Sequence, residues 1–324
     1  MNIGIETDKR EEKYKPKIGL ALGSGVARAW AHIGVIRALE KYNIKPDIIV
    51  GSSGGAIIGG LHAAGYLNEI EDWAYNLSKF TMFRYVDLKF LGNGFLKGDK
   101  LLDELKSYVG DVRIEDLKTP FAAIATDLET GHEVTLKQGD LAKVIRASFS
   151  MPAIFQPFKY CQRWLVDGAL VNPIPVSTCY ALGADIVIAV NLNGDMLGKI
   201  RMDQSEEMLK NSKFGYLSTD EEESELIKVP PSIMDKLFGG SKASNAPTLM
   251  ESIWATVLIT QDRIARSRLA GDPPDIHLTP YVGHIGISAF HRAKELVDSG
   301  AECVEQNIKD ITNIISLFKA KFYK

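Results

Sequence analysis

The segment from Ile48 to Ala64 constrains the fold of this chain more than any other. Its first residues, Ile48-Ile49-Val50, predict a short buried strand, and its apolar residues from Ala56 onward predict a helix. Between them lies Gly51-Ser-Ser-Gly-Gly55, the G-x-S-x-G pattern in a strand–turn–helix setting. A turn this tight needs small neighbours, and the two outer glycines let the strand and helix backbones approach closely. The segment therefore predicts an α/β fold with a sharp turn at the end of one strand.

Ser53 occupies the apex of that turn, and we expect its hydroxyl to project out of the fold. The amides at the start of the following helix lie below it and would stabilise developing negative charge. This arrangement predicts a nucleophilic serine. The alternative is a Gly/Ser-rich turn that matches the pattern without any chemistry. The strand and helix on either side favour the nucleophile.

The composition fits an ordinary globular protein and argues against nucleic acid as a partner. The chain has 324 residues, of which 45% are hydrophobic and 24% charged, with a net charge of -3. That charge gives no electrostatic reason to bind nucleic acid. The three cysteines, Cys161, Cys179 and Cys303, are odd in number and widely spaced. They favour reduced thiols in a cytoplasmic protein over a disulfide framework or a zinc site.

The order of predicted elements indicates one domain. A strand at Lys17–Leu22 and a helix at Ala31–Tyr42 precede the strand and helix around Ser53, which favours a parallel sheet with helices on both faces. Residues 1–16 form a polar lead-in, and residues 17–324 form the domain. The polar residues 195–248 are predicted to be a mobile insertion in that domain, because such a composition cannot bury a core.

The N-terminus is charged and lacks the apolar core of a signal peptide. No apolar run approaches the roughly 18 residues that a membrane span needs. We therefore expect a soluble cytoplasmic protein. Contact with the inner membrane surface from outside the bilayer stays open.

Asp167 is the candidate base for the serine. It follows a predicted strand at Arg163–Val166 and precedes Gly168. In a parallel sheet this position lies at the same carboxyl-end edge as Ser53. A carboxylate there could accept a hydrogen bond from the serine hydroxyl and then its proton. The alternative is a common Asp-Gly turn, and spacing alone does not separate the two.

No histidine has a local context that marks it as a catalytic base. His32 and His62 lie inside or beside predicted helices, where a structural role is the commoner one. The full set is His32, His62, His132, His277, His284 and His291.

The loop after the first strand is the candidate oxyanion hole. The backbone amides of Gly23, Ser24, Gly25 and Val26 could point at one site, with a helix N-terminus behind them. The alternative is the dinucleotide fingerprint G-x-G-x-x-G. It fails because Arg28 stands at the third glycine and no acidic residue ends the second strand.

Together these elements resemble the bacterial patatin-like phospholipase family. That family combines a glycine-rich loop, a G-x-S-x-G turn and a downstream Asp-Gly-Gly or Asp-Gly-Ala motif. The matching stretches here are Gly23–Ala29, Gly51–Gly55 and Asp167–Ala169, with further similarity at Ala31–Glu40, Arg146–Pro152 and Gln261–Pro274. The resemblance covers residues 17–192 closely and the C-terminal third more loosely.

The resemblance implies a three-layer α/β/α sandwich with a mainly parallel central sheet. It implies hydrolysis of lipid esters or phospholipids by a dyad of Ser53 and Asp167, through an acyl-enzyme and without histidine, metal or cofactor. It implies that the loop around Gly25 holds the oxyanion. The supporting motif residues are Arg28, Gly51, Gly55, Arg146, Gly168 and Ala169.

The chain departs from the family in the glycine-rich loop, where Ser24, Val26 and Ala29 replace three glycines. A β-branched Val26 is poorly suited to a positive φ, which predicts a rearranged loop or weakened activity if the hole needs that geometry. Two alternatives follow. One is an acyltransferase on the same scaffold, which would favour a histidine partner. The other is a lipid-binding or regulatory module that has lost turnover.

Overall fold

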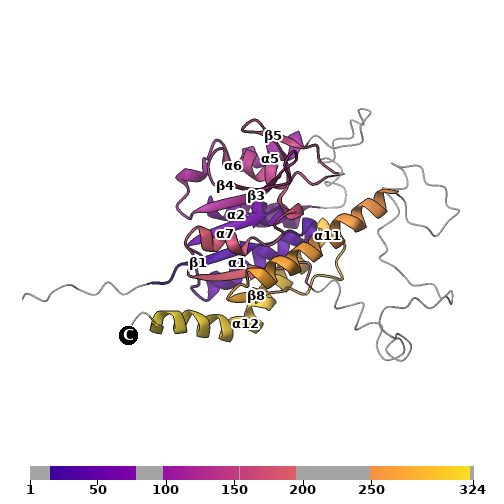
Figure 1. The fold of residues 1–324 in the computed structure, drawn as a ribbon. Coiled ribbons are helices and arrows are strands. Elements are labelled where there is room, and N and C mark those ends of the chain that lie inside the picture. The colour runs from indigo at the N-terminus through magenta and orange to yellow at the C-terminus, as the bar shows by residue number, and fades with distance from the viewer. Residues whose placement is uncertain (1–14, 78–97, 153, 195–248, 322–324) are drawn as a thin grey trace, which may run out of the picture.

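The computed structural model describes residues 15–77, 98–152, 154–194 and 249–321 (Figure 1). Most of the predicted lead-in and the whole predicted insertion at 195–248 lie outside these residues, so both stay predictions. The described chain is built on an eight-stranded sheet. Its strands are β1 (Ile18–Leu22), β2 (Ile48–Ser52), β3 (Phe121–Asp127), β4 (Glu133–Leu136), β5 (Phe158–Tyr160), β6 (Arg163–Asp167), β7 (Ile186–Val190) and β8 (Ile276–Leu278).

The centre of the sheet is parallel, as predicted. The strand order is β5-β6-β3-β2-β1-β7-β8, with β4 paired to β3 outside that path. The pairs β1–β2, β2–β3, β1–β7 and β7–β8 are all parallel. The chain moves outward from β1 through β2 to β3 and later returns to the other side of β1 at β7. This reversal places the loop after β1 at the position where open α/β sheets commonly hold a functional site.

Strand β6 is antiparallel to β3, so the expectation that Asp167 ends a parallel strand is wrong. The pairing of β2 with β3 ends at Ser52 and Ile124, while β3 continues to Asp127. The end of β3 that extends past β2 pairs with β6, and Ala125 lies opposite Asp167. Asp167 therefore lies beside the end of β2, next to Ser53, although its own strand runs in the opposite direction.

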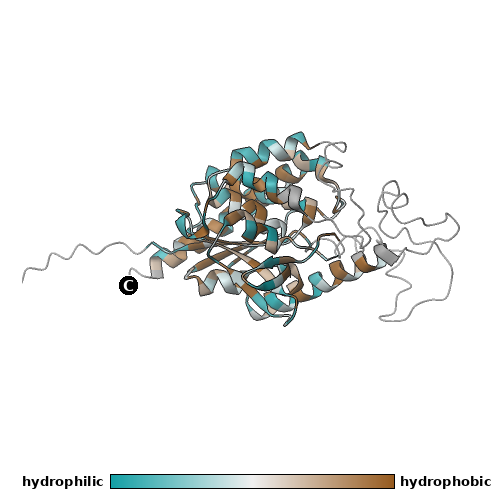
Figure 2. Ribbon diagram, turned by 90° about the horizontal axis from the view of Figure 1, so that it is seen from above, coloured by the Kyte–Doolittle hydropathy of each residue, from teal (hydrophilic) through white to brown (hydrophobic). Residues whose placement is uncertain are grey.

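Helices cover both faces of the sheet, which confirms the three-layer α/β/α prediction. Alternate strand residues face two separate cores, as Leu20 and Ala21 do in β1. The first face packs against α1 (Ala31–Lys41), α2 (Gly54–Ala63), α3 (Leu67–Asn76), α5 (Asp99–Val109), α6 (Leu141–Ser148) and α12 (Ala293–Lys321). The second packs against α7 (Val176–Ala181) and α11 (Leu249–Gly271). Figure 2 shows hydrophobic residues concentrated in the strands between these layers.

Two glycines let α1 and α12 pack closely. A Cβ atom at Gly34 would lie 1.8 Å from the carbonyl oxygen of Val297, and one at Gly300 would lie 2.0 Å from that of Ala31. Both contacts lie in the first half of α12, which runs from Ala293 to Lys321. In the part of the chain that the structure describes, no helix is both long and apolar enough to cross a bilayer.

Candidate active site

The turn around Ser53 has the predicted close approach of strand and helix. Strand β2 ends at Ser52 and α2 begins at Gly54, with Ser53 between them at φ 55° and ψ −119°. A Cβ atom at Gly51 would lie 2.4 Å from the carbonyl oxygen of Gly55, and one at Gly55 would lie 2.1 Å from that of Leu22. Residues with side chains therefore do not fit at either glycine. The positive φ at a non-glycine residue shows that the surrounding structure holds Ser53 in a strained conformation.

Ser53 and Asp167 form a direct hydrogen bond inside the protein. The Ser53 hydroxyl donates to Oδ2 of Asp167 at 2.6 Å, and both residues are fully buried. The expectation that this hydroxyl projects out of the fold is therefore wrong. The backbone N–H of Ala169 donates to Oδ1 of the same carboxyl at 2.8 Å. Position 168, between Asp167 and Ala169, requires glycine, because a Cβ atom there would lie 2.1 Å from the carbonyl oxygen of Ile124. The structure thus brings together the two residues that the sequence analysis proposed as nucleophile and base.

The environment of Asp167 shifts its ionisation toward neutral pH. Burial raises the pKa of Asp167 to about 7, although the hydrogen bonds from Ser53 and Ala169 act in the opposite direction. Among the described residues, no cation contributes to this shift. A carboxyl that titrates near neutrality can both accept and return a proton at physiological pH.

The loop after β1 leaves two amides without acceptors. The amides of Gly23 and Ser24 donate to the carbonyl oxygens of Val190 and Pro173, both at 3.0 Å. Within the described residues, the amides of Gly25 and Val26 have no hydrogen-bond acceptor. Of the four residues proposed for the oxyanion hole, Gly25 and Val26 therefore have amides that remain available to a ligand.

Val26 adopts a positive φ, of 50°, although a β-branched residue is poorly suited to one. Gly25 before it is extended, at φ 179°. The loop also contacts the turn: a Cβ atom at Gly54 would lie 2.6 Å from Ala29 Cβ and 3.6 Å from the Val26 nitrogen. The Gly54 amide likewise has no acceptor among the described residues. The two segments with available amides are therefore neighbours.

Arg28 ties this loop to the 283–287 segment. Its side chain is buried, with Nε donating to the carbonyl oxygen of Ile285 at 2.8 Å and Nη2 to that of Gly283 at 3.2 Å. The amide of Ala27 donates to the carbonyl oxygen of Ile287 at 3.1 Å. Arg28, which stands where a dinucleotide fingerprint would have its third glycine, thus holds the loop against the segment before α12.

None of the six histidines, all of which the structure describes, is hydrogen-bonded to Ser53 or Asp167. His32 is fully buried in α1, and its Nε2 lies 2.8 Å from the carbonyl oxygen of Gly23. Burial lowers the pKa of His32 to about 4, so the ring is neutral at pH 7 and donates its Nε2 proton to that carbonyl. His32 has the structural contact that its place in a helix predicted.

The C-terminal end of α6 and the turn after it contain two serines whose contacts with the site the sequence did not reveal. The amide of Ser53 donates to the hydroxyl of Ser148 at 3.0 Å, and the amide of Asp167 donates to the carbonyl oxygen of Ser150 at 3.0 Å. Arg146 in the same segment is buried and donates to the Ser150 hydroxyl at 2.6 Å. The sequence signal was present, as two small hydroxyl residues at the end of a predicted helix, but it specified no partner.

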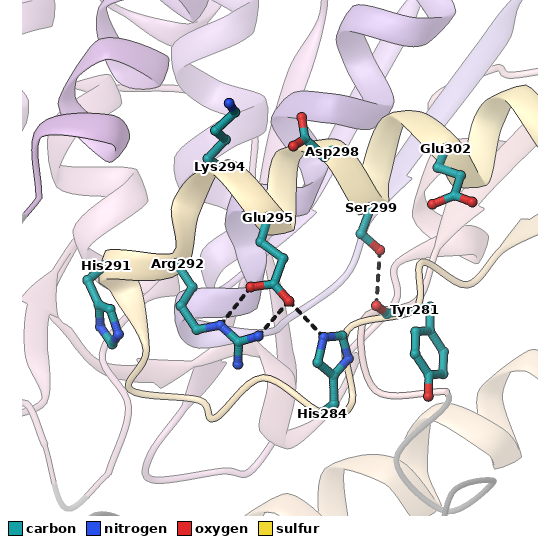
Figure 3. Close-up of a pocket in the computed structure, with 9 residues that line it drawn as sticks. All are labelled: Tyr281, His284, His291, Arg292, Lys294, Glu295, Asp298, Ser299 and Glu302. Atoms are coloured by element: carbon teal, nitrogen blue, oxygen red, sulfur yellow. Dashed lines mark hydrogen bonds and ion pairs between the residues drawn. The ribbon is translucent and has the colours of Figure 1, made fainter.

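A surface hollow lined by polar and charged residues lies elsewhere, between the 281–284 segment and the first turns of α12 (Figure 3). There Glu295 accepts hydrogen bonds from His284 at 2.9 Å and from Arg292 Nε at 2.7 Å. The hollow shares no residue with the Ser53–Asp167 pair. No cluster of His, Cys, Asp or Glu within the described ranges is arranged to hold a metal ion.

The sequence of this chain is similar to a protein-family model and to several known proteins. A family model described as patatin-like phospholipase matches residues 20–180. An uncharacterised NTE family protein of Mycobacterium bovis is 33% identical, over 91% of this chain and 92% of its own length. Lysophospholipase NTE1 of Saccharomyces cerevisiae is 30% identical over 54% of this chain, which corresponds to 11% of that much longer protein.

A solved structure is also similar. The crystal structure of VipD from Legionella pneumophila aligns with a TM-score of 0.46 and 13% sequence identity, covering 93% of this chain and 77% of that one.

Proposed function

Because this chain belongs to the patatin-like phospholipase family, we propose that it hydrolyses lipid acyl esters with Ser53 as nucleophile and Asp167 as base. The observation that carries the proposal is the buried 2.6 Å hydrogen bond between the Ser53 hydroxyl and the Asp167 carboxylate. The relative named a lysophospholipase supports phospholipids or lysophospholipids as the substrate class. The reaction would then be of the phospholipase A or lysophospholipase type.

The proposed reaction has two halves. Ser53 Oγ attacks the acyl carbonyl carbon, and its proton moves to Oδ2 of Asp167. The tetrahedral intermediate collapses, the leaving alcohol takes the proton from Asp167, and the acyl group stays on Ser53. Water then attacks this ester and gives its proton to Asp167, and the fatty acid leaves as Ser53 recovers a proton. The pKa of about 7 suits a group that must hold and release a proton in each half.

The oxyanion of each intermediate is proposed to bind the amides of Gly25, Val26 and Gly54. The support is that these amides lie on two neighbouring segments and, within the described residues, have no other acceptor. The amide after the nucleophile is a usual donor in such turns. Preorganised donors of this kind stabilise negative charge without any reorganisation during the reaction. The amides of Gly23 and Ser24 are excluded because they bond to the backbone elsewhere.

The proposed setting is a cytoplasmic protein that reaches lipid at a membrane surface or in solution without crossing the bilayer. Its three cysteines are unpaired thiols, as a reducing compartment would leave them. No metal or cofactor takes part in any of the proposed steps.

Two alternatives remain to be separated from hydrolysis. An acyltransferase would pass the acyl group to an acceptor other than water, but the histidine partner that such enzymes favour is not hydrogen-bonded to Ser53 here. A lipid-binding module without turnover drew its support from the altered loop, and the available amides of Gly25 and Val26 weaken that support.

Fluorophosphonate labelling tests the proposal. The purified protein is treated with the probe, and the modified peptide is identified by mass spectrometry. We expect an adduct on Ser53, no adduct in Ser53→Ala, and release of fatty acid from a lysophospholipid by the parent protein. Absence of an adduct in the folded protein would favour the binding module, and product transfer to an added alcohol in preference to water would favour the acyltransferase.

A further inference from the structure

One short turn contacts both members of the Ser53–Asp167 pair. We name Ser148–Ser150, which closes the C-terminal end of α6, the 148–150 turn. Its first residue accepts a hydrogen bond from the Ser53 amide through Oγ at 3.0 Å. Its last residue accepts one from the Asp167 amide through its carbonyl oxygen, also at 3.0 Å. Both serines of the turn are fully buried.

The Ser53 amide needs such a partner because the turn removes it from the sheet. The ladder between β2 and β3 ends at Ser52, and Ser53 leaves it with a φ of 55°. A buried N–H without an acceptor is costly, and a strained residue persists only when its surroundings fix it. The hydroxyl of Ser148 supplies the missing acceptor at the residue that carries the nucleophile.

Arg146 in turn fixes the 148–150 turn. Its guanidinium donates to the Ser150 hydroxyl at 2.6 Å and to the carbonyl oxygen of Gln156 at 3.3 Å. It lies over the rings of Phe155 and Phe158, at 5.0 and 5.4 Å from their centroids. The Ser150 hydroxyl donates back to the carbonyl oxygen of Arg146 at 2.8 Å. A buried planar cation with several partners gives the turn a single position.

We propose that Ser148 is a positioning residue of the proposed reaction: its hydroxyl holds the strained Ser53 backbone so that Oγ stays on the Asp167 carboxylate. The hydroxyl contacts the Ser53 main chain and takes no part in proton transfer. The same turn fixes Asp167 through the backbone of Ser150, so one rigid unit sets the separation between the two reacting groups. This inference rests on the proposed function of Ser53.

The test compares Ser148→Ala with Ser148→Thr, which keeps the hydroxyl, and with Ser52→Ala as matched control. Ser52 is adjacent to Ser53 and fully buried, but its hydroxyl has no partner among the described residues. For each folded protein, the rate of fluorophosphonate labelling at Ser53 and the kcat and KM for a short-chain nitrophenyl ester are measured.

We expect Ser148→Ala to lower the labelling rate and kcat by about 10- to 100-fold, because small displacements of a reacting group have effects of that size. The KM of Ser148→Ala should be unchanged. Ser148→Thr should recover most of the labelling rate and kcat, and Ser52→Ala should have the labelling rate and kcat of the parent protein. If Ser148→Ala does not fold, Ser148→Cys replaces it, and its weakly accepting sulfur should give a partial loss.

Equal labelling rates for the parent and the folded Ser148→Ala or Ser148→Cys variant would overturn the positioning role while leaving the proposed function intact. A loss of the same size in Ser52→Ala would also overturn it, since any small cavity at the turn would then have that effect. If the parent protein itself is never labelled at Ser53, the proposed function fails, and the positioning role fails with it.

Discussion

His32 and Asp167 are two titratable side chains that burial affects in opposite ways. Both are fully buried near the carboxyl end of the parallel strands, His32 against the carbonyl of Gly23 and Asp167 against the hydroxyl of Ser53. Burial lowers the pKa of His32 to about 4 and raises that of Asp167 to about 7. In each case the protein disfavours the charged form, because a low-dielectric interior solvates charge poorly.

The difference decides which of the two can move a proton at pH 7. His32 is neutral through the physiological range, and its one proton is committed to a backbone carbonyl. Asp167 is divided between its two forms near pH 7 and already accepts a hydrogen bond from the candidate nucleophile. Histidine usually titrates near neutral pH, but His32 cannot exchange a proton here. Asp167, a residue type that is usually ionised at pH 7, is the one that can.

The largest effect should come from removing the base. Asp167→Asn should lower kcat/KM for a nitrophenyl ester by at least about 100-fold, since general base catalysis contributes that much or more. His32→Gln should keep most of the activity, because a glutamine amide can still donate to the Gly23 carbonyl. Comparable losses in both variants, at comparable folded fractions by circular dichroism, would remove the functional distinction between the two residues.

The sequence was sufficient to predict the parallel centre of the sheet, the Ser53 turn and the structural place of His32, because each depends on local signals. A strand, a glycine pair and a helix are all read within a few residues of Ser53. The reason given for Asp167 was wrong, although the structure does place it beside Ser53. Its strand is antiparallel to β3, and it reaches Ser53 because β3 extends past the last residue of β2. Strand direction depends on the path of the chain between strands, which local patterns do not record.

Two features of the site depend on long-range contacts and could not be predicted. Val26 holds a positive φ against its own preference, while the next residue in the loop is bonded to the 283–287 segment. Ser148 meets Ser53 across 95 residues of sequence. The pattern around Ser148 predicted a helix end, and only the packing of α6 beside α2 makes it a partner of the nucleophile.

The pH dependence of activity should follow Asp167 and not His32. If Asp167 must be ionised to accept the Ser53 proton, kcat/KM should fall about tenfold for each pH unit below 6, with a midpoint near 7. The measurement is a pH profile with the nitrophenyl ester from pH 5 to 8.5. The profile of His32→Gln should have the same midpoint, and a midpoint that moves with His32 would reverse the assignment.

Asp167 should also make the protein less stable as the pH rises. Between about pH 4 and 7 the native state keeps the Asp167 proton, whereas the unfolded chain, with a pKa near 3.8, has released it. The free energy of unfolding therefore falls with rising pH across this window. Asp167→Asn lacks that loss, so its stability relative to the parent should increase by a few kcal/mol from pH 4 to pH 8. Urea unfolding at a series of pH values measures this difference, and a constant offset would contradict it.

His32 should contribute a smaller total change of the opposite sign, because its pKa is displaced over a narrower pH window. Between about pH 4 and its ordinary value of 6.5 the unfolded chain binds a proton that the native state does not, so the free energy of unfolding rises with pH. His32→Gln should remove this rise, and in the same titration its stability relative to the parent should fall by a few kcal/mol from pH 4 to 6.5. Because the two windows overlap, the slopes largely cancel in the parent protein. A flat profile in the parent therefore agrees with both shifts, whereas flat differences for both variants would show that neither pKa is displaced by burial.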